Sequence, residues 1–325
     1  MKRKKLIIPF LLVVIIIIGI FLYYWISAKS FTIGDYDCRF ENGTGKLECS
    51  IVLQKYNGSD ANVVIPSHIL LWKVKYIAED FFTENGLDNT TVETVVVPDS
   101  VEYISEKAFE NCIVLRQIQL GKNIKAIGRK AFLRCLSLEQ IEFPDSLTKI
   151  DGAAFGICTA LKEITIPDSV QYIGDNAFAE CTRLEKVTGG NGLTEIGNTV
   201  FEGTQWLLDY PTESVILGKM LVAYKGNEKD VYLEEGIVGV SPKAFYDIEV
   251  DSIHMPDTLS YFNLRFSEEY INKHGKVKVY FPNSNDIVFS QRMETLIPNF
   301  IFVAPKDSSA IKYAQENGIE YIIEE

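Results

Sequence analysis

The stretch that decides the fold is IEFPDSLTKIDGAAFGICTALKE (141–163), followed directly by ITIPDSVQYIGDNAFAECTRLEK (164–186). The two segments share Pro-Asp-Ser, Ala-Phe, two isoleucine positions, one cysteine position and one leucine position. Their 23-residue spacing continues outward in both directions and links three sets of identical residues: Phe109, Phe132, Phe155, Phe178 and Phe201; Ile104, Ile127, Ile150, Ile173 and Ile196; Cys112, Cys135, Cys158 and Cys181. A period in the twenties is typical of a solenoid built from stacked coils.

One unit has a simple physical interpretation. The alternation of Ile164 and Ile166 with polar residues predicts a short strand with one buried face. Pro-Asp-Ser then turns the chain, because proline fixes φ and the polar side chains bond to neighbouring backbone groups. Ile173 points inward again, and a tight helical turn carrying Phe178 and Cys181 closes the coil. A single unit cannot bury this apolar face alone, so we expect units to stack with strands about 4.8 Å apart.

These residues resemble the BspA-like (Treponema pallidum-type) class of leucine-rich repeat surface proteins. Residues 161–181 match its motif L-x-x-I-x-I-P-x-S-V-x-x-I-G-x-x-A-F-x-x-C at nearly every fixed position. The resemblance implies a leucine-rich-repeat solenoid of 23-residue repeats, with a parallel β-sheet and short helical or 3-10 turns, preceded here by one N-terminal transmembrane helix. It also implies a closing helix and strand near 310–319, with the helix capped by Ser308 or Ser309 and ended by Gly318. Repeat register weakens at 187–209 and is lost at 262–299.

The sequence divides into five expected parts. Residues 1–5 form a basic cytoplasmic tip and 6–26 a transmembrane signal anchor. Residues 31–62 form an N-terminal capping hairpin region. The leucine-rich solenoid covers 63–261 and includes a hairpin insertion at 210–230. Residues 262–325 are expected to be an irregular region and a C-terminal cap.

The transmembrane prediction rests on the segment LIIPFLLVVIIIIGIFLYYWI at 6–26, which carries no charge. As a helix it would extend roughly 31 Å, enough to cross a bilayer. Lys2 to Lys5 would hold its start in the cytoplasm. A cleaved signal peptide is the alternative, although the apolar run is longer than such peptides usually have. Either interpretation predicts that the rest of the chain is exported to the cell surface.

Composition narrows the classes of partner. The 325 residues include 32 Lys+Arg and 44 Asp+Glu, a net charge of −12, and hydrophobic residues make up 47%, as in globular proteins. Residues 1–30 carry five basic and no acidic side chains, so the remainder has −12 − 5 = −17. This charge argues against binding to nucleic acid, which requires a basic face. We expect a protein or glycan partner at the cell surface, and contact with the membrane through 6–26.

The cysteines have two interpretations. Cys38 and Cys49 flank a turn-like segment, and a hairpin centred on Gly43-Thr44 would place them opposite each other, within reach of a disulfide. Two half-buried thiols are the alternative. The four cysteines repeated at 23 residues are interpreted as buried apolar core residues, because their spacing does not supply the close ligand pairs of a zinc site. No cofactor and no metal is expected. The aspartates of the repeated Pro-Asp turns are explained by turn chemistry, since calcium needs about six to eight oxygens around one ion.

Two surface features are candidate binding sites. Stacking would align outward side chains of the repeated strand into a polar strip, made of Gln117, Gln119, Gln140, Glu142, Glu163, Thr165, Lys186 and Thr188. Solenoid sheets often bind proteins, but this strip lacks the aromatic and arginine anchors that dominate binding energy. Aromatic residues near the insertion form a second candidate, the patch of Trp206, Tyr210 and Tyr224. For each feature, a purely structural or solvated role is the alternative.

The function hypothesis that follows is non-catalytic protein binding or adhesion, as the resembled family implies. The sequence has no nucleophile elbow, zinc-protease, Walker or dinucleotide motif. Two alternatives stay open. One is a membrane-tethered extracytoplasmic enzyme or enzyme accessory, which a cleft holding His274 beside a carboxylate, with His254 nearby, would favour. The other is a structural envelope protein.

Overall fold

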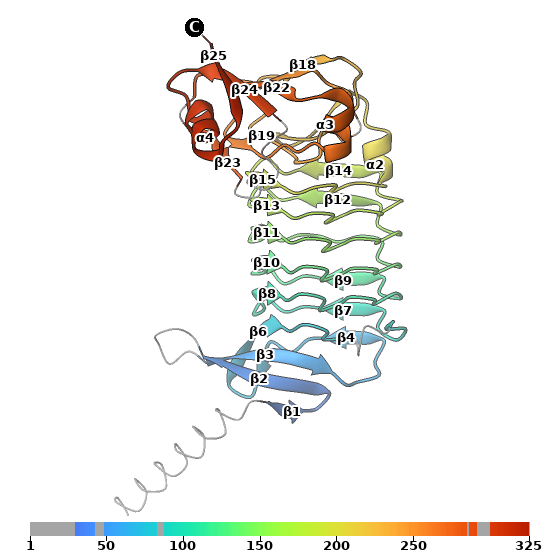
Figure 1. The fold of residues 1–325 in the computed structure, drawn as a ribbon. Coiled ribbons are helices and arrows are strands. Elements are labelled where there is room, and N and C mark those ends of the chain that lie inside the picture. The colour runs from blue at the N-terminus through green and yellow to red at the C-terminus, as the bar shows by residue number, and fades with distance from the viewer. Residues whose placement is uncertain are drawn as a thin grey trace, which may run out of the picture.

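A column of stacked coils forms the centre of the molecule (Figure 1). The computed structural model describes residues 30–42, 49–82, 88–246, 248–284, 286–290 and 300–324. The cap and one face of the column are built from β1 (Phe31–Ile33), β2 (Tyr36–Asn42), β3 (Cys49–Tyr56), β5 (His68–Ile69), β6 (Trp72–Ile77), β8 (Tyr103–Ile104), β10 (Ala126–Ile127), β11 (Lys149–Ile150), β13 (Tyr172–Ile173) and β15 (Glu195–Ile196). The second face is built from β4 (Asn62–Val64), β7 (Thr94–Val96), β9 (Gln117–Gln119), β12 (Glu163–Ile166) and β14 (Lys186–Gly189).

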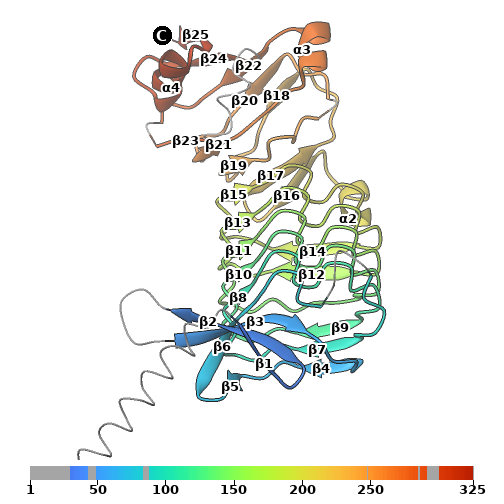
Figure 2. The same cartoon turned by 60° about the horizontal axis from the view of Figure 1, so that its bottom comes forward.

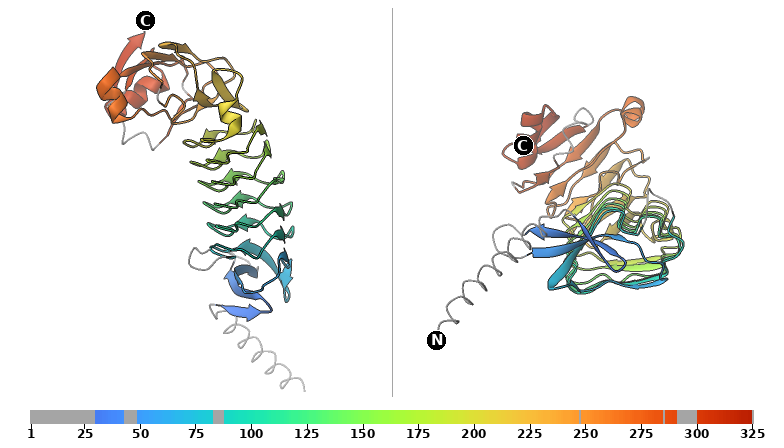
Figure 3. Two further views of the ribbon diagram at one scale, coloured as in Figure 1. Left: turned by 90° about the vertical axis from the view of Figure 1, so that its right-hand side faces the viewer. Right: turned by 90° about the horizontal axis from the view of Figure 1, so that it is seen from below.

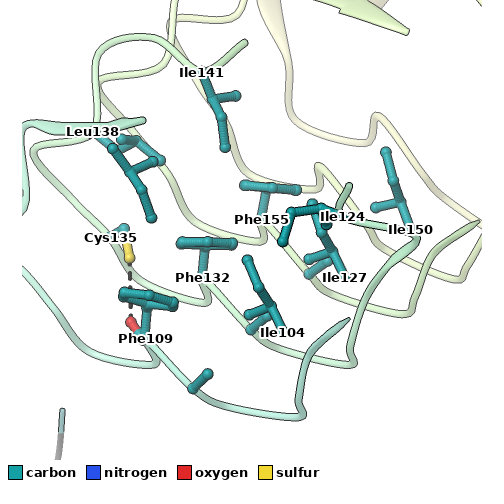
Figure 4. Packing of buried hydrophobic residues seen from close by; sticks show 14 of the residues in the cluster. Ile104, Phe109, Ile124, Ile127, Phe132, Cys135, Leu138, Ile141, Ile150 and Phe155 are labelled. Carbon is teal, nitrogen blue, oxygen red and sulfur yellow. Dashed lines mark hydrogen bonds between the residues drawn. The ribbon is translucent and has the colours of Figure 1, made fainter. Parts of the chain in front are cut away.

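The repeated phenylalanines form a continuous buried ladder, as predicted. Ring centroids of Phe109 and Phe132 lie 4.7 Å apart, those of Phe132 and Phe155 4.9 Å, and those of Phe155 and Phe178 5.2 Å. Phe201 continues the stack at 5.5 Å. All five side chains are buried. Figure 4 shows the ladder beside the repeated isoleucines, which pair directly across adjacent parallel strands.

The predicted short helical or 3-10 turns are present as single turns with i→i−3 hydrogen bonds, and they do not extend into helices. Asn176 and Glu180 have left-handed backbone, with φ of 58° and 59°, and the other coils repeat this at the equivalent positions. The left-handed residues prevent a helical run. Some turn amides bond within the turn, as Ala179 N–H does to the carbonyl of Asn176 at 3.1 Å. The amides between them bond to the next coil, as Asn176 N–H does to the carbonyl of Asn198 at 2.9 Å and Phe178 N–H to that of Val200 at 2.9 Å. The turns therefore hold neighbouring coils together as the strands do.

The N-terminal cap covers the first coil with antiparallel strands, but its register differs from the prediction. Cys38 lies opposite Leu53, and Cys49 lies opposite Asn42, with a bulge between Asp37 and Cys38. Four residues of strand separate the two positions, about 13 Å, which a disulfide cannot span. Cys38 is a free, buried thiol. The predicted Cys38–Cys49 bridge is wrong, because the register is set by burial of Ile51 and Leu53 against β6.

The predicted insertion at 210–230 does contain a hairpin, formed by β16 (Ser214–Leu217) and β17 (Met220–Tyr224). It follows the short helix α2 (Gln205–Leu208). β17 also pairs in parallel with β19 (Gly239–Val240), so this strand belongs both to the hairpin and to the parallel sheet that follows it. The hairpin is therefore part of the solenoid, and it contributes residues to two separate hydrophobic clusters. One hydrophobic cluster extends from Cys38 to Val222 and a second from Leu221 to Ile319.

Coiling continues beyond the predicted solenoid boundary. The outer face of the C-terminal part is the parallel sheet of β18 (Asp230–Tyr232), β20 (Ser252–His254), β22 (Val277–Tyr280), β24 (Phe300–Pro305) and β25 (Glu320–Glu324). The opposite sheet adds β21 (Tyr261–Phe262) and β23 (Val288–Phe289) after β19. The helix α3 (Glu268–His274) is inserted between two strands, which is why the sequence period is lost there. In Figure 3 this part leans away from the axis of the column.

The closing helix agrees with the prediction. α4 (Ser309–Asn317) is capped by Ser308, whose hydroxyl accepts a hydrogen bond from the amide of Ile311, and it ends at the left-handed Gly318. The predicted transmembrane segment at 6–26 and the basic tip lie outside the described residues. Within the ranges that the structure describes, no helix has the length and apolar character needed to span a bilayer.

Candidate binding face

The predicted polar strip exists as a continuous exposed face. Gln117, Gln140, Glu163 and Lys186 pair in order across parallel coils, so their side chains form one column. Thr165 and Thr188 pair in the neighbouring column. All eight residues of the strip are exposed. The buried residues between them, such as Ile164, hold the strand against the phenylalanine ladder and thereby fix the outward direction of the strip.

Within the strip, the polar groups largely satisfy one another. The ammonium of Lys186 lies 3.3 Å from the Glu163 carboxylate, and the hydroxyls of Thr165 and Thr188 are 3.0 Å apart. A shallow hollow of about 450 Å³ runs along this column. Exposed ion pairs of this kind contribute little energy and are screened by salt. The strip supplies a regular polar surface and no strong anchor.

The same outward position becomes aromatic in the C-terminal coils. Tyr232, His254 and Tyr280 directly follow the buried Val231, Ile253 and Val279, as Thr165 and Thr188 follow Ile164 and Val187, and they pair across β18, β20 and β22. We call these three residues the aromatic ladder. The rings of Tyr232 and His254 stack at 4.0 Å, and those of His254 and Tyr280 at 4.1 Å. Sequence reasoning missed this ladder, although the aligned motifs VYL, IHM and VYF contain its signal.

The position of His254 determines its protonation. Burial between the two tyrosines lowers its pKa, and the negative charges of Asp230 and Glu324 oppose this shift. The Ser252 hydroxyl lies 3.4 Å from its Nε2 and donates to the Asp230 carboxylate at 2.6 Å. The ladder thus contains an imidazole stacked between two phenols, and its lowered pKa favours the neutral form.

A hollow of about 640 Å³ lies beside Tyr232, the first residue of the aromatic ladder, where the hairpin separates β14 from β18. Tyr232 lines it and is 71% exposed, the most exposed aromatic side chain that the structure describes. The lining includes the carboxylates of Glu213, Glu228, Asp230 and Glu234, and we call this feature the acidic hollow. The Tyr224 hydroxyl donates to Glu228 and lowers the pKa of that carboxyl. Burial raises the pKa of Tyr224 itself.

The predicted aromatic patch of Trp206, Tyr210 and Tyr224 is mainly core. Trp206 is buried against Phe201 at 4.8 Å and Tyr210 at 5.3 Å. Tyr224 is buried too, but it stacks with Phe245 in the second hydrophobic cluster. The three rings therefore do not form one exposed patch. They close the two cores on either side of the hairpin, and Tyr210 and Tyr224 additionally line the acidic hollow.

Tyr76, Tyr103 and Tyr172 line the opposite face of the column, each just before a buried isoleucine, while Ala126, Lys149 and Glu195 take this position in the other coils. The rings of Tyr76 and Tyr103 stack at 5.2 Å, and the Lys149 ammonium lies 5.3 Å from the ring centre of Tyr172. These side chains are half-buried among their neighbours. Sequence reasoning did not single them out, because Ala126 interrupts the series.

The histidines of the enzyme hypothesis have separate partners. His274 Nδ1 lies 3.4 Å from the Glu249 carboxylate, so a carboxylate is present as that hypothesis requires. The same carboxylate pairs with Lys229 at 3.0 Å, and His274 packs on Tyr270 at the end of α3. His254 contacts Tyr232 and Tyr280 instead. The described contacts explain Glu249 and His274 as the anchoring of an inserted helix.

The four repeated cysteines lie in the core as predicted. Each is a buried free thiol. The thiols of Cys135, Cys158 and Cys181 donate to the phenylalanine carbonyls of the previous coil at 3.1 to 3.3 Å, and Figure 4 shows the first of these bonds. Burial raises the pKa of Cys112 and that of Cys135, so the thiolate form is disfavoured at both positions. Among the residues that the structure places, no group of three His, Cys, Asp or Glu side chains is arranged to hold a metal.

Comparison with known families identifies the repeat. The family model described as BspA type leucine rich repeat region matches residues 73–207 in six copies. Residues 73–207 therefore form a BspA-type leucine rich repeat region. Its BspA-type repeats coincide with the phenylalanine ladder and the polar strip. The aromatic ladder lies beyond them, in coils whose sequence spacing has diverged.

Solved structures contain related solenoids. A leucine rich cell surface protein from Faecalibacterium prausnitzii is 18% identical, with 91% of this chain and 95% of that chain covered and a TM-score of 0.51, so it shares the fold. The T. pallidum leucine rich repeat protein is 29% identical over 51% of this chain and 75% of that chain, with a TM-score of 0.46. A leucine-rich repeat protein from Bacteroides ovatus is 22% identical, covering 84% and 70%, with a TM-score of 0.48. The comparison with curated proteins gave no significant match.

Proposed function

We propose that this protein is a non-catalytic cell-surface protein, anchored through residues 6–26, that binds another protein through the outer sheet face. The aromatic ladder and the acidic hollow form the centre of this face, and the polar strip extends it along the column. The observation that carries the proposal is the position of Tyr232. It is a large, 71% exposed ring that follows a run of polar outward residues from Gln117 to Thr188.

A rigid aromatic anchor beside a hollow is the usual centre of a protein-binding surface. Stacking on His254 immobilises the Tyr232 ring before a partner arrives, so little side-chain entropy remains to be lost on binding. The stack also occupies one face of Tyr232 and both faces of His254. What the ladder offers to a partner is therefore its ring edges and the outer face of Tyr232.

Charge indicates the chemistry of the partner. Four carboxylates line the hollow beside the outer face of Tyr232. The neighbouring Lys225 and Lys229 do not neutralise them, because Lys225 donates to the Tyr210 carbonyl at 2.8 Å and Lys229 pairs with Glu249. An arginine or lysine of a partner would gain both cation–π and charge interactions here. We therefore expect a protein that presents an exposed basic segment.

Membrane anchoring is supported by the uncharged sequence of 6–26 and by the basic residues before it. The location at the cell surface is supported by the match of residues 73–207 to the BspA type repeat region, which resembles a class of surface proteins. Figure 1 shows β18 and β22, which carry Tyr232 and Tyr280, at the end of the column opposite β1. With an anchor that precedes β1, a partner outside the cell could reach the aromatic ladder at that end.

Site-specific photo-crosslinking on intact cells tests the proposal. A benzophenone amino acid replaces Tyr232, and matched variants carry it at Thr188, one column position earlier on the same face, and at Leu208, an exposed residue of α2. We expect a discrete crosslinked protein at position 232, weaker crosslinking at 188 and none at 208. A protein captured equally at all three positions, a captured glycan, or no product at 232 would contradict the proposed protein-binding role.

A further inference from the structure

A hairpin at the N-terminal end of the column exposes two leucines. β5 and β6 pair with His68 opposite Lys73 and Ile69 opposite Trp72, and Leu70 and Leu71 form the turn between them. Leu70 is 59% exposed and Leu71 is 88% exposed, while Ile69 is buried. We call Leu70, Leu71, Trp72 and Lys73 the hairpin tip.

The turn residues are unusual for a hairpin in water. Two-residue hairpin turns favour Asn-Gly or Asp-Gly, because the backbone there adopts positive φ. Leu70 has φ of 55°, a conformation that carries a steric cost for any side chain with a Cβ. The tip therefore combines an unfavourable backbone with two large apolar side chains in solvent. Such a feature at an exposed turn indicates a role outside the folding of the hairpin itself.

The tip lies beside the point where the chain enters the folded part. Phe31, in the first strand, stacks with Phe40 at a centroid distance of 5.0 Å, and Phe40 contacts the Trp72 ring at 4.9 Å. Two ring contacts thus connect the start of β1 to the hairpin tip. Figure 2, with the N-terminal end of the column turned toward the viewer, shows β1, β5 and β6 together at this end.

The sequence preceding β1 indicates what this end faces. The 21-residue apolar segment 6–26 ends five residues before Phe31. Five residues span at most about 17 Å, so the cap must stay close to any bilayer that this segment crosses. From this position, and resting on the proposed membrane anchoring, we infer that the hairpin tip inserts into the outer surface of the lipid bilayer.

The side chains of the tip fit the layers of that surface. The two leucines at the turn would reach the boundary between headgroups and acyl chains, where an apolar side chain is favoured. Trp72, half-buried behind them, would lie at the headgroup level, which tryptophan prefers. The exposed Lys73 would face the lipid phosphates. With the anchor as one attachment and the tip as a second, the column is held at a fixed orientation to the membrane.

Fluorescence quenching by lipids tests this inference in the full chain, reconstituted in phosphatidylcholine liposomes. Leu71→Cys is labelled with the environment-sensitive dye NBD. Leu208→Cys is the matched control, because Leu208 is also a highly exposed leucine, at 67%, but lies in α2 far along the column. The free cysteines that the structure describes are buried, and labelling of the unsubstituted chain measures the background.

We expect lipids with a doxyl group on the acyl chain to lower the fluorescence at position 71 at least about two-fold, and to leave position 208 unchanged. A dye at Lys73→Cys should be quenched as well, and Leu70→Ser with Leu71→Ser should abolish that quenching. Flotation of the same liposomes reports the anchor separately. If the protein floats with the liposomes but quenching is equally weak at positions 71 and 208, the inference is overturned and the proposed membrane anchoring is not. Chain that does not float overturns both. A blue-shifted but unquenched dye at 71 would show that protein covers the tip, which also overturns the inference.

Discussion

Replacing Phe155 by alanine tests how much the phenylalanine ladder stabilises the column. Phe155 is fully buried and stacks on Phe132 at 4.9 Å and on Phe178 at 5.2 Å, with Phe143 in edge contact at 5.5 Å. Truncation of a buried phenylalanine to alanine costs about 3–5 kcal/mol, through lost burial and the cavity that remains. Neighbouring coils cannot close this cavity easily, because hydrogen bonds on both sides fix their spacing. We therefore expect the upper half of that range, about 4–5 kcal/mol.

The comparison with Phe155→Leu separates volume from stacking. Leucine retains most of the buried apolar surface but loses three aromatic contacts, each worth about 0.5–1.5 kcal/mol. We expect Phe155→Leu to cost about 2 kcal/mol, roughly half the effect of alanine. Urea unfolding followed by circular dichroism gives both free energies of unfolding, provided that the denaturant slope is unchanged. A cost below about 1.5 kcal/mol for alanine would refute the reasoning, because it would mean that the ring does not occupy a tightly packed stack.

Three further predictions concern titration, backbone and thiols. Burial lowers the pKa of His254, so the folded state binds fewer protons than the unfolded chain. The free energy of unfolding should therefore fall as the pH drops below about 6.5. Unfolding curves measured from pH 5 to 8 should show this decline, and His254→Phe should remove the part that His254 causes. Ala153 has φ of 53°, whereas Ala154 is buried and has an ordinary backbone conformation. Ala153→Gly should leave the free energy of unfolding unchanged or raise it by up to about 1 kcal/mol, whereas Ala154→Gly should lower it by about 1 kcal/mol. Equal shifts of the melting temperature in the two variants would contradict this. Burial raises the pKa of Cys38 to about 11 and also raises the pKa values of Cys112, Cys135 and Cys158, while the hydrogen bond with Cys158, together with burial, raises that of Cys181. These five cysteines should react with a thiol reagent at pH 8 only after denaturation, and rapid modification of any of them in the native protein would place it at the surface.

The regular part of the fold could be predicted from sequence, because one residue type recurs at one spacing. Phe109 to Phe201 and Ile104 to Ile196 are such series, and the structure stacks each of them. The outward direction of Gln117 to Thr188 followed from the alternation within the repeated strand. The capping of α4 followed from Ser308 and Gly318, because caps depend on local backbone geometry.

The remaining features depended on contacts that spacing does not report. The C-terminal coils begin at Val231, Ile253 and Val279, and α3 lengthens one of the intervals, so no single period connects them. For the same reason the aromatic ladder was missed, since its three rings are unevenly spaced and of two types. The Cys38–Cys49 pairing was wrong because a bulge and the packing of Leu53 set the register, and neither is visible in a hairpin motif.

The function of the face depends on the same geometry. Stacking converts residues that are far apart in the sequence into one continuous surface, polar along the column and aromatic beside the acidic hollow. If the coils did not lie directly on one another, neither the polar strip nor the Tyr232 anchor would form a site. The stacking of coils is therefore the claim on which the proposed binding role depends.

A distance measurement between spin labels on Asn62→Cys and Lys186→Cys tests that claim most directly. These residues lie 124 positions apart, yet five consecutive strand pairings connect them through Thr94, Gln117, Gln140 and Glu163. Five spacings of about 4.8 Å predict a separation near 24 Å between the backbone positions. A narrow distribution around this value, widened only by the label arms, is the expected result. A broad distribution, or one centred beyond about 40 Å, would contradict direct stacking of the coils.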